Sequence, residues 1–527
     1  MRPSIRCLRS FRDRVTDLDS FRDGGVFLSL TPLNLHNGNN TMSTPSPSGS
    51  DGPVAPSLSA TIGLWLGPAW LLMTLLLPAP GDMPESAWLC LGVALLMATW
   101  WATEALPIPA TSLLPLVLIP VLGINDMSSV ASSYANPIIY LFLGGFLLGI
   151  AMQRWELHRR IALKVLQVVG HQPRQQIAGF MIATGFLSMW VSNTATAIMM
   201  LPIGLSVVSL LEDSDPKEVS RYATALLLAI AYSASIGGVA TLIGTPPNAL
   251  LAAYLAEDRG IDVGFAQWMM VGLPISIVMM TAAWWWLTRK SFNLAVGSNG
   301  GDMVKQELAK LGQMSKAERR VGILFLLAAI AWVSRPFLND LGLVWLNDTG
   351  IAITAGILLF LLPSGQQRGE RLMVWEDAQQ LPWGILLLFG GGLALAGAIK
   401  ASGLATWIAD QLSMFGALPL LMLIGIVVLV IIFLTEVTSN TATAAAFLPL
   451  LGALALSLDI SPLMVTVPAA IAASCAFMMP VATPPNAIVF ATGHMKIQSM
   501  IRAGFALNLI STPVVTLMAY LLILAFW

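Results

Sequence analysis

The chain has 527 residues, of which 56% are hydrophobic and only 10% carry charge, against about 25% charged residues in an ordinary soluble protein. Its formal net charge of −1 excludes a strongly basic nucleic-acid binder. The three cysteines are too few and too scattered for a disulfide framework or a metal cluster. The composition predicts an all-α polytopic membrane protein whose main surroundings are the lipid bilayer.

Residues 1–55 do not share the pattern of the rest of the chain. Six arginines fall within the first 22 residues, and a stretch rich in Asn, Ser, Pro and Gly follows. Such a segment lacks a core-forming pattern. It is a disordered tail, a start placed too early with Met42 as the true initiator, or a targeting segment, and we assign it no function.

Apolar runs near the roughly 20 residues needed to cross a bilayer recur from residue 58 to the C-terminus. They predict about eleven transmembrane helices, near 58–79, 86–103, 106–124, 137–153, 222–257, 266–288, 321–337, 350–364, 382–400, 463–493 and 503–527. Two further apolar stretches, 175–210 and 415–455, are each interrupted by a Ser-Asn-Thr triplet that is costly in hydrocarbon unless protein buries it. We interpret both as re-entrant hairpins, although length alone also permits two short spanning helices in each.

Lysine and arginine concentrate in short cytoplasmic loops and so predict the orientation. With the N-terminus in the cytoplasm and the C-terminus outside, the cytoplasmic loops, which include 154–174, hold 18 basic residues and the external loops hold three. The six arginines of the tail complete the 27, so the middle of the membrane receives none. We expect the plasma (inner) membrane as the location, and a cytoplasmic linker at 289–320 that is a surface helix or a plain solvated segment.

Two motifs occur twice in the same order. Ser-Asn-Thr-Ala-Thr begins at Ser192 and again at Ser439, 247 residues later, and Thr-Pro-Pro-Asn-Ala begins at Thr245 and again at Thr483, 238 residues later. An odd number of membrane crossings separates the two halves, so the second copy should have the opposite orientation. The chain is therefore predicted to be an inverted repeat, which in transporters places the binding site at the membrane midplane. Its first half is 56–288, with the hairpin at 175–210, and its second half is 321–527, with the hairpin at 415–455.

The repeated residues predict both anion and cation niches. Ser, Asn and Thr are strong N-cap residues, so the second arm of each hairpin should begin at the triplet with free N–H groups and a positive dipole end that attract a carboxylate. The first arms should end near Ser188 and Thr435, where unpaired carbonyls suit sodium. Each Thr-Pro-Pro-Asn segment should break its helix, because proline lacks a donor and disfavours helix in the preceding residue.

At these motifs the sequence resembles the divalent anion:sodium symporter family, which includes the di- and tricarboxylate transporters. The resemblance covers about 58–527 and also rests on the segment from Trp100 to Pro109 and on Phe389 with the three glycines after it. It implies eleven membrane helices and two re-entrant hairpins tipped by Ser-Asn-Thr. It further implies a scaffold domain that holds a homodimer and a transport domain that moves as an elevator.

Carried over by position, the resemblance implies one sodium site made of Ser188, Ser192, Asn193 and Gly244, and a second made of Thr435, Thr438, Asn440 and Ala482. The substrate carboxylates would be held by Ser192, Asn193, Thr194, Ser439, Asn440 and Thr441, with Thr245, Pro246, Thr483 and Pro484 closing the site. Sodium ions would be co-transported, and no organic cofactor is implied. Both triplets are intact, as in family members that generally handle dicarboxylates, which favours C4-dicarboxylates such as succinate, malate and fumarate.

Other functions remain alternatives on the sequence alone. The same motifs suit a citrate or sulfate symporter, or a sodium-independent dicarboxylate exchanger. A membrane enzyme is disfavoured, because the four histidines lie in the tail or in predicted loops and no nucleophile and base stand at a recognisable spacing, so no catalytic residue is expected. Two symmetric anion-binding helix ends argue against a channel or a sodium/proton antiporter. Glu436 could bind a proton, bias cation binding or brace the hairpin, and Glu104 raises the same question.

Overall fold

The computed structural model describes the chain from residue 58 to the C-terminus, except for 171, 212–214, 293, 295–298 and 413–417. The expectation for residues 1–55 concerns a segment outside this described part. Pro56–Trp527 forms one compact unit. Its described residues are helical, apart from turns, loops and one isolated bridge between Pro363 and Arg371.

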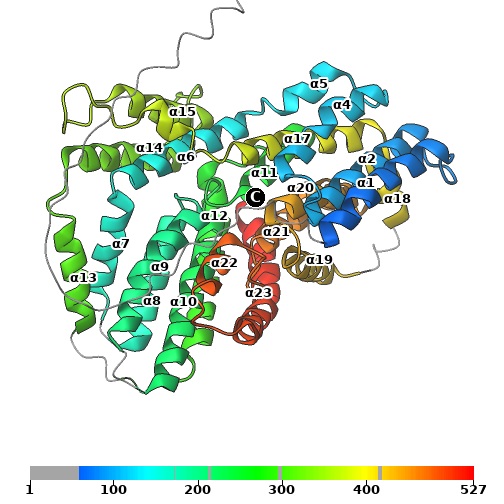
Figure 1. Cartoon of the computed structure of the whole chain (residues 1–527). Coiled ribbons are helices and arrows are strands. Elements are labelled where there is room, and N and C mark those ends of the chain that lie inside the picture. The colour runs from blue at the N-terminus through cyan, green and yellow to red at the C-terminus, as the bar shows by residue number, and fades with distance from the viewer. Residues whose placement is uncertain (1–57, 171, 212–214, 293, 295–298, 413–417) are drawn as a thin grey trace, which may run out of the picture. The chain divides into compact units, whose positions relative to one another are not determined.

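The first half and the linker contain α1 to α13 (Figure 1). Their bounds are α1 (Leu58–Leu76), α2 (Glu85–Thr103), α3 (Ile108–Thr111), α4 (Leu114–Val121), α5 (Met127–Ser133), α6 (Pro137–Arg154), α7 (Leu157–Val168), α8 (Pro173–Ser188), α9 (Asn193–Ser209), α10 (Pro216–Val239), α11 (Pro246–Arg259), α12 (Phe265–Thr288) and α13 (Asn299–Lys310). The second half contains α14 (Lys316–Asp340), α15 (Asp348–Leu361), α16 (Trp375–Ala378), α17 (Trp383–Ala401), α18 (Leu404–Leu412), α19 (Leu420–Thr435), α20 (Asn440–Ser457), α21 (Leu463–Ala473), α22 (Pro484–Phe490) and α23 (Ile497–Phe526).

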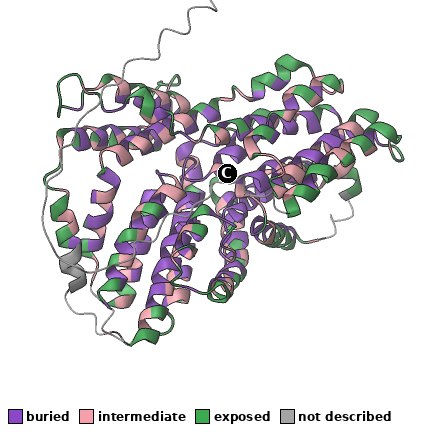
Figure 2. Cartoon of the chain, viewed as in Figure 1, coloured by how far each residue is buried: buried purple, intermediate pink, exposed green. Residues whose placement is uncertain are grey.

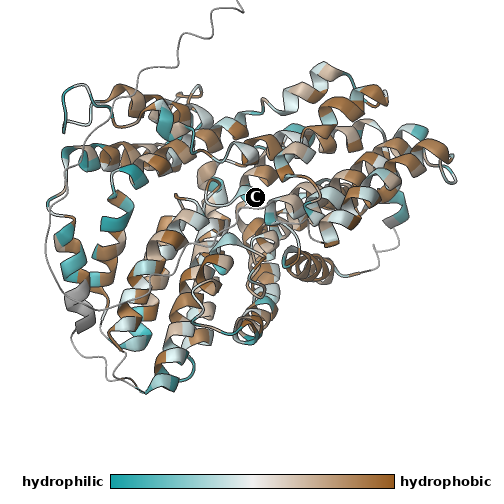
Figure 3. Ribbon diagram, viewed as in Figure 1, coloured by the Kyte–Doolittle hydropathy of each residue, from teal (hydrophilic) through white to brown (hydrophobic). Residues whose placement is uncertain are grey.

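The described residues include nine helices that are long and apolar enough to cross a membrane, and shorter apolar helices accompany them. Figure 3 shows hydrophobic residues along the length of most of these helices. Large apolar side chains are exposed on α14, including Ile323, Leu327 and Ile330, which are about half exposed (48%, 58% and 54%). Apolar surface of this kind is stable in lipid and not in water, so the chain is an integral membrane protein.

The hairpin arms end where the triplets predict. The helix α8 ends at Ser188 and α9 begins at Asn193, while α19 ends at Thr435 and α20 begins at Asn440. In both hairpins the serine of the triplet is the N-cap and has non-helical backbone angles. The repeated sequence therefore folds into the same helix–turn–helix twice, with the turn in the same register.

The proline motifs end helices as expected. The helix α10 stops at Val239 and α11 starts at Pro246, so the predicted 222–257 helix is two helices separated by a short loop. In the second half α21 stops at Ala473 and α22 starts at Pro484. The threonine before each proline pair has φ and ψ of −144° and 142° in the first copy and −142° and 148° in the second, which is the extended conformation that a following proline favours.

Two stretches differ in detail from the prediction. The helix expected at 106–124 is interrupted by a turn at residues 112–113, which separates α3 from α4, although the apolar helical stretch continues over Ile108–Val121. The expected loop at 154–174 contains the twelve-residue helix α7. On this helix Lys164 is exposed while Leu163 and Leu166 are buried, so it is amphipathic rather than apolar and the length rule for spanning segments overlooks it.

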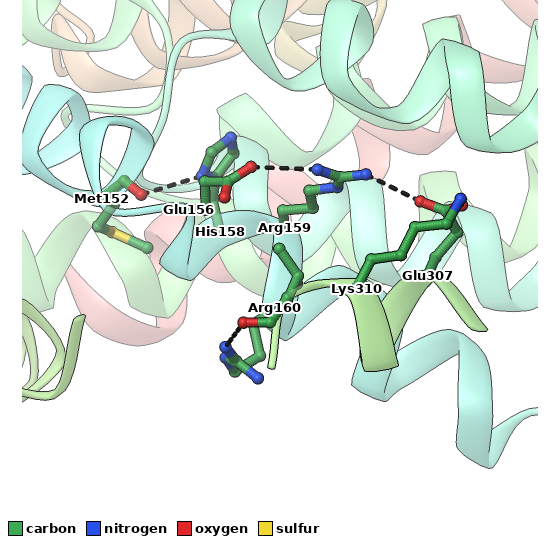
Figure 4. A network of polar contacts seen from close by, with 8 residues as sticks. Met152, Glu156, His158, Arg159, Arg160, Glu307 and Lys310 are labelled. Atoms are coloured by element: carbon green, nitrogen blue, oxygen red, sulfur yellow. Dashed lines mark hydrogen bonds and ion pairs between the residues drawn. The ribbon is translucent and has the colours of Figure 1, made fainter. Parts of the chain in front are cut away.

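The helix α7 is fixed to the linker by ion pairs (Figure 4). Arg159 contacts Glu156 at 3.1 Å and Glu307 of α13 at 2.9 Å. The buried Arg160 pairs with Glu318 of α14 and donates to the carbonyl of Gly312 at 2.9 Å. These contacts hold the first hairpin's base and the linker together, because α7 also packs against α8.

The core forms around α10, which is buried along most of its length (Figure 2). The helices α8 and α9 lie beside it, and so do α12 and α22. The two halves also exchange contacts: α9 packs against α22, and α20 packs against α11. Each hairpin's second arm thus lies beside the helix that follows the proline motif of the other half, which brings all four repeated motifs into one region.

Candidate functional site

A hydroxyl and a carboxamide meet at the tip of each hairpin. The Oγ of Ser188 lies 2.5 Å from the Oδ1 of Asn193, and the Oγ1 of Thr435 lies 2.6 Å from the Oδ1 of Asn440. Ser188 and Thr435 are fully buried, whereas both asparagines are half-buried. Two neutral oxygens next to the carbonyl end of a helix are suitable ligands for a sodium ion.

The first proline motif closes its loop through its asparagine. The Nδ2 of Asn248 lies 3.1, 3.2 and 2.8 Å from the carbonyl oxygens of Gly238, Val239 and Thr241. Trp268 donates its indole N–H to the same Val239 carbonyl at 2.9 Å. These bonds fix the orientation of carbonyl groups that the end of α10 leaves without helical partners.

The second proline motif repeats this arrangement. The Nδ2 of Asn486 lies 3.1 Å from the carbonyl oxygens of both Ala476 and Met479. In each half the asparagine therefore contacts the carbonyls seven and ten residues before it. The duplication extends from the sequence to individual hydrogen bonds.

The first predicted sodium set converges. The position of a Cβ on Gly238 would be 2.8 Å from the Oδ1 of Asn193 and 3.0 Å from the carbonyl oxygen of Gly244. Asn193 and Gly244 are therefore near neighbours, and Ser188 reaches the same carboxamide. Ser192 directly precedes Asn193 as the N-cap of α9.

The second predicted set is brought together only in part. Thr435 reaches both Asn440 and, at 3.0 Å, the carbonyl of Ala473. The hydroxyl of Thr438 instead lies 2.9 Å from the carbonyl of Leu434 and 2.6 Å from the hydroxyl of Thr443. Ala482 is buried and donates its N–H to the carbonyl of Met479 at 3.2 Å. That bond fixes the last turn before Thr483, so Ala482 lies in the second break (474–483, between α21 and α22), as Gly244 lies in the first break (240–245, between α10 and α11).

Glu436 fills the space between the second hairpin and the second break. Its carboxylate accepts from the backbone N–H groups of Phe477, Met478 and Met479 at 2.7, 2.8 and 2.8 Å, and from the Nδ2 of Asn508 at 2.7 Å. The residue is 1% exposed. Four donors satisfy a carboxylate in full, which supports the bracing role among the alternatives considered for Glu436.

Glu436 also explains why the two breaks differ in length. When the two proline motifs are aligned, Val239 at the end of α10 corresponds to Phe477. The helix α21, however, already ends at Ala473. The carboxylate takes N–H groups that a continuing helix would need for its own bonds. The position that corresponds to Glu436 in the first half is Met189, whose carbonyl accepts from the hydroxyl of Thr241 at 2.5 Å. In both halves the hairpin tip accepts and the break donates, but the acceptor is a backbone carbonyl at Met189 and a side-chain carboxylate at Glu436.

The anion-binding ends are predicted at the beginnings of α9 and α20, which the structure places at Asn193 and Asn440. Ser192 accepts from the N–H of Ala195 at 3.3 Å, whereas Ser439 forms no side-chain cap bond. Both serines are half-buried. Free N–H groups and a positive dipole end in a partly accessible position can bind a carboxylate.

The two breaks meet between the halves. The hydroxyl of Ser474 lies 3.5 Å from the hydroxyl of Thr245, and both residues are buried. Thr483 is buried as well and caps α22 by accepting from the N–H of Asn486 at 3.3 Å. Pro246 is half-buried and Pro484 is exposed. Of the four residues expected to close the site, Thr245 therefore has a contact with the other half.

The segments that form this region carry no lysine or arginine, since these residues are absent from 175–216, 222–258 and 401–495. The polar groups described above are hydroxyls, carboxamides and backbone dipoles, with Glu436 already satisfied by its donors. Such groups can bind a small anion and alkali cations together. They differ in kind from a nucleophile that is activated by a neighbouring base.

Several contributing residues are not predictable from their local sequence. Asn248 and Asn486 belong to the repeated motif, but only the structure reveals their role, and Asn508 lies in an apolar segment without any motif. The duplication of the two motif asparagines is the signal that could have identified them. Glu104 is exposed at the end of α2, in a left-handed conformation with φ of 49°, so it is not a buried acid.

Comparison with known proteins gives a consistent assignment. A family model described as the sodium:sulfate symporter transmembrane region matches residues 59–527. The chain is 44% identical over 475 residues to the sodium-dependent dicarboxylate transporter SdcS of Staphylococcus saprophyticus, covering 88% of this chain and 91% of that protein. It is 45% identical, with the same coverage, to the protein of the same name from Staphylococcus aureus strain USA300.

A solved structure supports the fold. The crystal structure of the Alcanivorax borkumensis YdaH transporter, described as having an unusual topology, matches with a TM-score of 0.54 at 16% identity and covers 82% of this chain and 99% of that chain. The match of the family model over nearly the whole described part of the chain is decisive. The chain belongs to the sodium:sulfate symporter family, the group of divalent anion:sodium symporters that its repeated motifs resemble.

Proposed function

We propose that this protein is a sodium-coupled symporter of divalent organic anions, with C4-dicarboxylates such as succinate, malate and fumarate as its substrates. The observation that carries the proposal is the duplicated hydroxyl–carboxamide pair, Ser188 with Asn193 and Thr435 with Asn440, in a region without lysine or arginine. The names of the 44% and 45% identical relatives, sodium-dependent dicarboxylate transporters, support the same substrate class.

The two hairpins offer one carboxylate-binding end each. One carboxylate would bind at the start of α9, at Ser192, Asn193 and Thr194, and the other at the start of α20, at Ser439, Asn440 and Thr441. Thr245, Pro246, Thr483 and Pro484 would close the site from the breaks. A ligand with two carboxylates on a short carbon chain would match one such end in each hairpin.

Charge balance favours coupling to sodium. A dianion in the membrane carries a desolvation cost of several kcal/mol per charge unless positive charge is near. Each helix end contributes only about half a charge. Bound sodium ions would supply the remainder, one at Ser188, Ser192, Asn193 and Gly244 and one at Thr435, Thr438, Asn440 and Ala482. The first set is the better supported, because the second is brought together only in part.

We further propose the architecture that family membership suggests. Residues 56–288 and 321–527 would be the inverted halves, joined by the cytoplasmic linker 289–320, with the N-terminus in the cytoplasm and the C-terminus outside the plasma membrane. A homodimer held by the scaffold domain would let the transport domain move as an elevator. The charged helices α7 and α13 fit the cytoplasmic side, where basic residues concentrate.

Uptake by purified protein in liposomes tests the proposal. Labelled succinate should enter in the presence of a sodium gradient, and unlabelled malate and fumarate should compete, whereas preferential competition by citrate or sulfate would identify an alternative substrate. Asn193→Ala and Asn440→Ala should each abolish uptake. Ser206→Ala is the matched control, since this residue is exposed on α9 and its hydroxyl donates to the Pro202 carbonyl of its own helix. Normal uptake in both asparagine variants would refute the proposed site.

A further inference from the structure

The two cation niches differ at equivalent positions of the repeat. Gly238 lies in the last turn of α10 and Gly244 lies in the first break, and the residues 238 positions later are Ala476 and Ala482. Thus both glycines of the first niche are replaced by alanines in the second. At each of these positions the halves differ by one methyl group. The effect of that methyl group on a sodium site depends on the atoms that surround it.

The hydrogen bonds show that the carbonyls of Gly238 and Ala476 make the same contact in the two halves. The carbonyl of Gly238 lies 3.1 Å from the Nδ2 of Asn248, and the carbonyl of Ala476 lies 3.1 Å from the Nδ2 of Asn486. Each asparagine is ten residues beyond its partner. The comparison therefore concerns corresponding positions with the same asparagine contact, although Gly238 lies in the last turn of α10 and Ala476 lies in the loop after α21.

Gly238 lies against the groups assigned to the first niche. A Cβ at this position would be 2.8 Å from the Oδ1 and 3.2 Å from the Nδ2 of Asn193, and 3.0 Å from the carbonyl oxygen of Gly244. A Cβ on Gly244 would be 2.4 Å from the carbonyl oxygen of Gly238. Neither glycine has a positive φ, so the requirement for glycine is close packing and not backbone conformation.

A methyl group at Gly238 would displace the Asn193 carboxamide. The Oδ1 of Asn193 is 2.5 Å from the Ser188 hydroxyl, so a shift that relieves its 2.8 Å approach to the new Cβ changes the geometry of that pair. The carboxamide is also the first side chain of α9, at the carboxylate-binding end. The second niche accommodates a methyl group at Ala476, where the buried carboxylate of Glu436 lies between its loop and the hairpin.

We propose that Gly238 is a positioning residue that sets the first cation niche apart from the second. Because Gly238 has no side chain, the Asn193 carboxamide and the Gly244 carbonyl can converge on one sodium ion. An alanine at this position disrupts the first site, although the second site has an alanine at the corresponding position. The inference rests on the proposed function and extends it, since it makes the two sodium sites unequal. Gly238 acts through its neighbours, because it offers no side-chain ligand.

Thermal unfolding of purified protein at increasing sodium concentration, without dicarboxylate, tests this directly, because a bound ion stabilises the folded state. For Gly238→Ala we expect the half-saturating sodium concentration for this stabilisation to rise about tenfold or more, the usual effect of disturbing groups that orient ion ligands. The dependence on sodium should also become less steep.

Gly425→Ala is the matched control for the change of residue type, because its new Cβ would lie 3.7 Å from Thr516, at ordinary contact distance. Wild-type sodium dependence in Gly238→Ala would overturn the inference. A wild-type protein that is not stabilised by sodium and takes up no succinate would instead refute the proposed function, so the two failures are distinguishable.

A double variant covers the case in which Gly238→Ala is unstable. Asn193→Ala removes both side-chain atoms that the new methyl group would approach. If the clash with Asn193 is the cause, Asn193→Ala/Gly238→Ala should unfold in sodium-free medium at the temperature of Asn193→Ala alone, and the second change should not weaken sodium binding further. A double variant as unstable as the single Gly238→Ala variant would contradict the inference.

Discussion

Asn508 donates its Nδ2 to the Oε1 of Glu436 at 2.7 Å, and both residues are buried. This bond joins α23 to the tip of the second hairpin, and the remaining acceptor capacity of Glu436 is used by three backbone N–H groups of the second break. One carboxylate therefore connects three parts of the second half. In the first half, Met189 occupies the equivalent position.

Glu436→Gln should destabilise the protein. A glutamine can retain one acceptor oxygen, but its amide group would face the N–H of Met479 in place of Oε2. A buried donor without an acceptor costs about 1–3 kcal/mol. Thermal unfolding of the purified protein measures the effect. Glu104→Gln, at an exposed position, is the control and should stay within about 0.5 kcal/mol of the wild type; an equal loss in both variants would contradict the bracing role.

Asn248→Asp should impair the protein more than Asn248→Ala. The Nδ2 of Asn248 contacts three carbonyl oxygens at 3.1, 3.2 and 2.8 Å, and a carboxylate would place negative charge against all of them in a buried position. Alanine merely removes the donor, at a cost of about 1–3 kcal/mol for the unsatisfied carbonyls. Unfolding temperature and succinate uptake should fall in the same order. The reverse order would show that these carbonyls are not held by the carboxamide.

His158 should make the stability fall in mildly acidic medium. Burial lowers the pKa of His158 below its ordinary value of 6.5, and the hydrogen bond to the Met152 carbonyl only partly opposes this. The folded protein then binds fewer protons than the unfolded chain. The contribution of uncharged His158 to the stability of the folded protein is therefore complete above pH 6.5, and it is lost as the pH falls toward the folded-state pKa. The unfolding temperature at about pH 7.5 and about pH 5.5 should differ less in His158→Gln than in the wild type. An identical pH dependence in the two proteins would exclude this histidine as a cause of the loss of stability in acidic medium.

Local chemistry predicted the hairpins well. The triplets and the proline pairs set helix starts through capping and the missing proline donor, which depend only on neighbouring residues. The ends at Ser188 and Thr435 agree with the structure for this reason. Family membership was likewise evident from the duplicated motifs, and the family model confirms it.

Other features depend on contacts that the sequence does not reveal. The early end of α21 is caused by Glu436, which is far from it in the chain, and the role of Asn508 requires knowing which residues α23 faces. The helix α7 escapes prediction because it is amphipathic and short. The different surroundings of Gly238 and Ala476 likewise follow from packing between the hairpin tip and the break, although both positions belong to the same repeat.

The dependence of uptake on sodium tests the central claim most directly. Purified protein in liposomes should take up labelled succinate from sodium medium, steeply with sodium concentration, and scarcely from choline or potassium medium at the same pH. The reason is that no lysine or arginine is present in 175–216, 222–258 or 401–495 to neutralise a dianion. Equal uptake from choline and sodium media would contradict sodium coupling.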